Sequence, residues 1–241
     1  MRAPEKIACL ALLAVLLQAC GSGGVDEPLF PLQPGQRWTY RVETLVDELD
    51  AKPKRETLTL ETRQAAEVLG QMAWHRRSSS GVDYWLRSDA SGVYRLASKG
   101  PLDDDPIKDP EPRYVLRKPY QVGTSWEADT TLYVLARRNE FPPELKHLDK
   151  YKHLKMIYRI EAVDQQVTTP AATFKGCVQV EGRTVIKLFT DATLSMEDVN
   201  ILTHESYCPG VGLVRLHREE PSPTKFIQGG QFLMELTRHS S

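Results

Sequence analysis

Apolar and polar residues alternate with a period of two along most of this chain, and no long stretch shows the 3.6-residue period of an amphipathic helix. Successive side chains of a strand point to opposite faces, so this pattern predicts strands that are buried on one face only. Thr, Val, Tyr and Ile, which suit a pleated surface, are enriched in the alternating runs. The chain is therefore predicted to be all-β and mainly antiparallel. The clearest predicted strands cover residues 38–45, 56–62, 131–135, 156–163 and 177–180.

A single short helix is predicted at Pro143–Tyr151, where a proline can occupy the first helical turn. Elsewhere, pairs containing glycine or proline separate the alternating runs and predict turns between strands.

A motif near the start of the chain recurs in its middle. Pro31–Trp38 and Pro119–Trp126 share the pattern P-x-Q-x-G-x-x-W, and Gly92–Leu96 has a fainter echo at Gly212–Leu216. One reading is an internal duplication of a small antiparallel meander, and the other is chance recurrence of Pro, Gly and Trp. In a duplication, the glycine of each copy forms a turn that delivers a tryptophan to the core. The residues with these structural roles are Gly35, Trp38, Tyr40, Gly123, Trp126, Gly210 and Gly212.

The domain prediction follows from this echo. We expect a single β-rich domain at residues 30–238, with halves at about 30–100 and 113–238. Residues 101–112 contain four prolines and five acidic residues and are predicted to be a solvated connector. A calcium loop is the alternative for the acidic side chains, but the D-x-D-x-D-G spacing of an EF-hand is missing.

The N-terminus predicts export. A basic start is followed by a short apolar run at Ile7–Leu17, and the small residue Ala19 directly precedes Cys20. This arrangement is typical of a signal peptide, here residues 1–19, and the run is too short to span a bilayer. Residues 20–29 are glycine-rich and predict a flexible tether.

Leu17–Cys20 resembles the lipobox of bacterial lipoproteins. The resemblance implies that Cys20 becomes the mature N-terminus and carries a diacylglyceryl thioether and an N-acyl chain, which anchor it in a membrane. Gly21 stands where enterobacterial inner-membrane lipoproteins carry Asp, so the resemblance favours the outer membrane, facing the periplasm. An ordinary secreted protein with a chance cysteine is the alternative.

Two cysteines remain in the exported chain, Cys177 and Cys208. In an oxidising compartment such a pair predicts a structural disulfide. A redox or metal pair is the alternative, but there is no C-x-x-C spacing and no neighbouring Cys/His cluster.

Three segments together resemble a group of uncharacterised bacterial envelope lipoproteins. Phe30–Tyr40 is similar to their PL-x-x-G-x-x-W-x-Y opening, Thr169–Val178 to their PAGTF-x-x-C segment, and Tyr207–Val214 to their GVGLV segment. Ala172 departs from the pattern, because glycine is usual there. The resemblance implies a curved antiparallel sheet or an incomplete barrel, and it implies little about function.

Composition and motifs limit the function. The 241 residues carry a net charge of −1, which does not favour nucleic-acid binding. No catalytic, metal-binding or cofactor fingerprint is present, so we expect a protein that is not an enzyme and holds no cofactor. The first hypothesis is an interaction or structural role with an envelope protein partner. The alternative is a carrier that binds a lipid or another apolar ligand in the concave face of the sheet.

Overall fold

The computed structural model describes residues 28–138, 154–189 and 196–240. It confirms the all-β prediction: one antiparallel twelve-stranded sheet has the order β6-β5-β4-β3-β2-β1-β14-β12-β11-β10-β9-β7, and β8 pairs with β13 in a second small sheet. The predicted helix at Pro143–Tyr151 lies outside the described residues. The strands are β1 (Arg37–Val46), β2 (Lys54–Val68), β3 (Gln71–Ser78), β4 (Asp83–Asp89), β5 (Gly92–Lys99), β6 (Ile107–Arg117), β7 (Ser125–Thr130), β8 (Ala136–Arg137), β9 (Leu154–Thr168), β10 (Thr173–Phe189), β11 (Met196–Cys208), β12 (Gly212–Glu220), β13 (Ile227–Gln228) and β14 (Gly230–Ser240).

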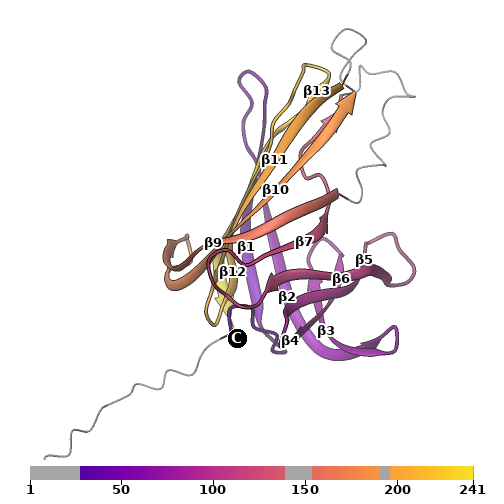
Figure 1. Ribbon diagram of the computed structural model, residues 1–241, viewed down its shortest axis with the longest axis vertical. Helices are drawn as coiled ribbons and strands as arrows, with labels where there is room; N and C mark the ends of the chain where they lie inside the picture. Colours follow the sequence, from indigo (N-terminus) through magenta and orange to yellow (C-terminus); the bar gives the residue numbers. More distant parts are fainter. Residues whose placement is uncertain (1–27, 139–153, 190–195, 241) are drawn as a thin grey trace, which may run out of the picture.

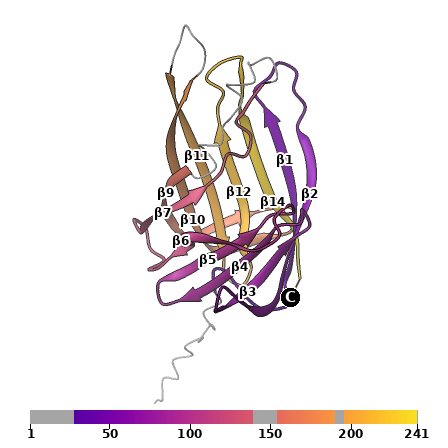
Figure 2. The ribbon, with the colours of Figure 1, turned by 90° about the vertical axis from the view of Figure 1, so that its right-hand side faces the viewer.

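The sheet consists of two six-stranded meanders. Strands β1 to β6 form the first, and β7, β9, β10, β11, β12 and β14 form the second, each in sequence order. The first strand of one meander pairs with the last strand of the other, β1 with β14. The sheet curves strongly, so that β3–β6 lie to one side of β1 and β12 in Figure 1 and cross in front of the long strands β1, β12 and β14 in Figure 2. This curvature makes the sheet an incomplete barrel.

The two sequence echoes occupy equivalent places in the two meanders. The Gly35 amide donates to the Thr62 carbonyl on β2 at 2.8 Å, and the Gly123 amide donates to the Ile160 carbonyl on β9 at 2.9 Å. Both glycines have a left-handed backbone, with φ of 87° and 92°. The fainter echo begins the fifth strand of each meander, β5 at Gly92 and β12 at Gly212. These matching positions are what an internal duplication predicts.

The change from one meander to the other lies at residues 118–124, between β6 and β7, rather than at the predicted connector 101–112. Only residues 101–106 form a loop, and residues 107–112 open β6. Because β6 is the last strand of the sheet, one side of its backbone needs no ladder partner. Proline, which lacks an amide hydrogen, is therefore tolerated in it at Pro110 and Pro112.

Cys177 and Cys208 form a disulfide in the structure, with their Cα atoms 4.1 Å apart. The neighbouring pair Val178 and Tyr207 is in register across β10 and β11, so the disulfide links these two strands directly. Both cysteines are fully buried in a core cluster that includes Trp38.

Candidate functional site

The concave side of the curved sheet carries two adjoining cavities that are partly open to solvent, of about 300 and 700 Å³. Their linings come from both meanders and overlap at Arg113, Tyr133 and Phe232, among others. These volumes lie within the range of about 300–1,000 Å³ that is usual for sites of small organic ligands. The barrel interior is therefore hollow enough to hold a ligand.

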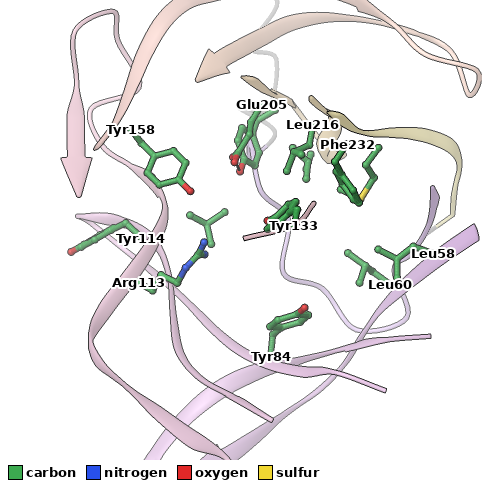
Figure 3. Close-up of a pocket in the computed structure, with 14 residues that line it drawn as sticks. Leu58, Leu60, Tyr84, Arg113, Tyr114, Tyr133, Tyr158, Glu205, Leu216 and Phe232 are labelled. Atoms are coloured by element: carbon green, nitrogen blue, oxygen red, sulfur yellow. Dashed lines mark hydrogen bonds between the residues drawn. The ribbon is translucent and has the colours of Figure 1, made fainter. Parts of the chain in front are cut away.

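Most of the smaller cavity is lined by aromatic and aliphatic side chains (Figure 3). Period-two alternation explains this lining, since every second side chain of a strand faces the interior. Tyr158 on β9 stacks on the buried Trp126 with ring centroids 5.7 Å apart. Tyr133 meets Phe232 edge to face at 5.1 Å. The aliphatic lining residues are Leu58, Leu60, Val115, Leu213, Leu216 and Met234.

Tyr133 reaches the middle of the site on a segment that is not a strand, contrary to the strand predicted at residues 131–135 (Figure 3). The fully buried carboxylate of Glu220 on β12 accepts the backbone amides of Tyr133, Val134 and Leu135 at 2.7–3.0 Å. These amides therefore bond to a side chain instead of a neighbouring strand. Arg218 Nε also donates to Glu220 at 2.6 Å, and its guanidinium lies 4.3 Å from the Tyr133 ring centre.

Two ionisable side chains face the smaller cavity from opposite meanders, Arg113 on β6 and Glu205 on β11. Burial raises the pKa of the Glu205 carboxyl, although the Tyr207 hydroxyl, which donates to it, and the Arg113 charge oppose the rise. Burial pulls the pKa of Arg113 down, but the neighbouring phenols, Tyr158 first, and Glu205 outweigh it and raise the pKa overall. Burial and the neighbouring side chains thus shift the pKa values of both groups upward.

A second arginine, Arg76 on β3, lines the larger cavity and is only 6% exposed. Its guanidinium lies between two rings, 4.5 Å from the centre of Phe30 and 4.2 Å from that of Trp38. It donates to the Pro31 carbonyl at 2.9 Å and to the Thr62 hydroxyl at 3.1 Å. Burial lowers the pKa of Arg76 to about 10, so it stays charged at neutral pH.

The barrel has a seam where β6 meets β7. Among the described residues no backbone ladder joins these strands, which are the two edges of the sheet. Side chains bridge the seam instead: Arg113 Nε donates to the Asp129 carbonyl, and Trp126 Nε1 to the Tyr114 carbonyl at 3.3 Å. Residues of both strands line the larger cavity, including Asp109 and Thr130. The seam is therefore one wall of the larger cavity.

Two of the predicted motifs meet in space. Trp38 Nε1 donates to the Val211 carbonyl at 2.7 Å, and the Tyr40 hydroxyl donates to the Leu213 carbonyl at 2.8 Å. The W-x-Y motif thus binds the backbone of the GVGLV segment, whose glycines at positions 210 and 212 both have positive φ. Tyr40 also lines the larger cavity. Cys20 lies outside the described residues, so its lipidation stays a prediction.

Sequence reasoning did not single out Arg76, Arg113 or Tyr133. On β6 the consecutive residues Arg113, Tyr114 and Val115 all line the smaller cavity, next to a shift in the β5–β6 register, so alternation alone does not predict their placement. Adjacent residues of a strand point to opposite faces, and His204 and Glu205 on β11 follow this rule: His204 is exposed, and Glu205 lines the cavity. Which face is interior depends on pairings between distant strands, which one sequence does not reveal.

The described residues contain no group of three or more His, Cys, Asp or Glu side chains placed to hold a metal ion. In the same part of the chain, no helix has the length and apolar character needed to cross a bilayer.

Comparisons with known proteins give two solved structures. No family model matches the chain, and no curated protein does. One structure is a proposed lipoprotein from Parabacteroides distasonis, with 13% identity and a TM-score of 0.40, covering 89% of this chain and 99% of that one. The other is a proposed exported protein with a YmcC-like fold from Bacteroides fragilis, with 17% identity and a TM-score of 0.37, covering 88% of this chain and 98% of that one.

Proposed function

We propose that this protein is a non-catalytic, lipid-anchored binding protein of the bacterial envelope that holds an amphipathic ligand inside its barrel. The observation that carries the proposal is the pair of adjoining cavities, whose lining combines tyrosines and leucines with Arg113. A filled interior would have favoured a purely structural or docking role, which was the first hypothesis from sequence. The cavities support the carrier hypothesis instead.

The test is native mass spectrometry of residues 21–241, exported to a bacterial periplasm and released without an acyl chain. Every residue that the structure describes lies within this chain. We expect a reproducible adduct with the mass of a lipid. A chain that stays free of adducts, and that takes up none when incubated with periplasmic lipid extract, would contradict the proposal and favour docking to a protein partner.

A matched pair of variants tests whether the bound lipid lies in the cavities. Val115 lines both cavities, whereas Val185 on β10 is 56% exposed on the outside of the sheet. Val115→Phe should reduce the adduct because the larger ring occupies the cavity, and Val185→Phe should leave it unchanged. Equal adducts in both variants would show that the lipid binds elsewhere.

The anchor is a separate part of the proposal and rests on the lipobox at Leu17–Cys20. We propose that acylated Cys20 holds the barrel on the periplasmic side of the outer membrane. Cys20→Ala should abolish labelling with radioactive palmitate and remove the protein from sedimented outer membranes. Cys9→Ala, a cysteine within the signal peptide, should change neither. Labelling that survives Cys20→Ala would exclude this anchor.

A further inference from the structure

Only some of the charged side chains that line the cavities form an ion pair with a side chain of opposite charge. Arg95 binds Asp109 through two hydrogen bonds of 2.7 and 2.6 Å, so these two charges cancel. The Asp129 carboxylate is 3.1 Å from Lys155 Nζ, which compensates it from outside the cavity lining.

Two arginines remain. In residues 28–138, 154–189 and 196–240, neither Arg113 nor Arg76 forms an ion pair with a carboxylate. The exposed Lys108 adds a third positive charge to the lining. Glu205 is the one remaining acidic side chain of the two linings, so these three cations outnumber it even when it is ionised. The interior therefore carries an excess of positive charge, which is costly in a partly desolvated space unless an anion neutralises it.

Arg113 is the better placed of the two arginines to receive an anion. Arg76 is already enclosed by Phe30, Trp38 and its two hydrogen bonds. In Arg113, the Nε atom is held by the Asp129 carbonyl, and the guanidinium points into the cavity between Tyr158 and Tyr133 (Figure 3). A guanidinium fixed in this way can offer its remaining N–H groups to a carboxylate or phosphate.

The opposite side of the same cavity is apolar. Leu58, Leu60 and Phe232 lie across the cavity from Arg113 (Figure 3). An occupant that satisfies both sides has an anionic head and a hydrocarbon tail. The cavity volumes suit a ligand with about one acyl chain rather than a large phospholipid.

We propose that the ligand is a single-chain anionic amphiphile whose carboxylate or phosphate head binds Arg113 beside the β6–β7 seam, with its chain against the leucines of β2. This inference rests on the proposed function, because it names the ligand class of the same cavity.

The test compares cis-parinaric acid with its methyl ester, which has the same chain and no charge. The fluorescence of both rises in an apolar site, so each can be titrated into residues 21–241. We expect the acid to bind at least about tenfold more tightly than the ester, as a charge-assisted hydrogen bond implies. Arg113→Gln should remove this preference, and Arg113→Lys should retain part of it.

The controls separate the possible failures. Arg183→Gln removes an exposed arginine on β10 and should leave both titrations unchanged. Equal binding of acid and ester by the unaltered protein would overturn the inference and leave the proposed function intact, and it requires no variant to fold. Failure of both probes to bind would count against the proposed function itself. Displacement of the acid by an equal concentration of inorganic phosphate would show an anion site that needs no acyl chain, and would also overturn the inference.

Discussion

A single buried carboxylate determines how residues 131–135 fold. Their alternating pattern predicts a strand, but their amides bond to Glu220, which is 85–87 residues away in the sequence. A buried carboxylate surrounded by N–H donors is an acceptor strong enough to compete with a strand ladder. No residue near 131–135 in the sequence indicates that Glu220 is their partner, so periodicity alone could not predict this contact.

Glu220→Gln should lower the free energy of unfolding by about 3–5 kcal/mol, because it leaves the buried Arg218 charge without its partner. The measurement is urea denaturation followed by fluorescence. Glu219→Gln on the same strand is the control: its side chain is 44% exposed, and its loss should cost about 0.5 kcal/mol or less. Equal effects of the two changes would show that Glu220 does not hold the 131–135 segment.

The raised pKa of Glu205 predicts a pH-dependent stability. Its carboxyl releases its proton at a higher pH in the folded state than in the unfolded state, so the folded state binds more protons between the two pKa values. The stability of the unaltered protein should therefore fall, relative to Glu205→Gln, as pH rises from about 4.3 through the folded-state pKa. Urea titrations of both proteins at several pH values measure the difference. If the free energy of unfolding of the unaltered protein did not fall relative to that of Glu205→Gln over this range, the raised pKa of Glu205 would be contradicted.

At the scale of elements, the sequence was most informative where a local rule suffices. Alternation located β1, β2, β9 and β10, and the P-x-Q-x-G-x-x-W echo located the start of each meander at β1 and β7. The connector at 101–112 was misplaced because proline and charge predict exposure, and the edge strand β6 is exposed as well. Whether such an exposed segment is an edge strand or a loop depends on the neighbouring strands rather than on its composition.

The equivalent turns at Gly35 and Gly123 should respond equally to substitution. A Cβ would meet nothing within 4 Å at either site, so the positive φ alone opposes alanine. Gly35→Ala and Gly123→Ala should each lower the free energy of unfolding by about 1 kcal/mol. At Gly100, φ lies outside the left-handed region and a Cβ would meet only the end of the Asp103 side chain, at 3.0 Å, which can move aside. Gly100→Ala should therefore cost less, as thermal unfolding can show. If alanine lowered the free energy of unfolding at only one of the two turns, the two turns would not be equivalent.

For the whole molecule, the arrangement of the meanders creates two comparable junctions with different bonding. At the first, β1 and β14 form an antiparallel ladder from Arg37 to Val46 with one register shift, between Thr39 and Tyr40. At the second, β6 and β7 are connected by side chains such as Arg113 and Trp126. Among the described residues, opening the β6–β7 seam would therefore break fewer backbone hydrogen bonds than opening the β1–β14 ladder, and the seam also lines the larger cavity.

Hydrogen exchange can test this difference within one protein. Peptides covering β6 and β7 should exchange faster than those covering β1 and β14, because amides directed toward the seam lack a strand partner. Saturating cis-parinaric acid should slow exchange at β6 and β7 and leave β1 and β14 unchanged, since the proposed head-group site at Arg113 lies beside the seam. Equal protection at both junctions in the ligand-free protein would mean that the seam is as closed as the ladder, and a ligand would then have to enter through another part of the barrel.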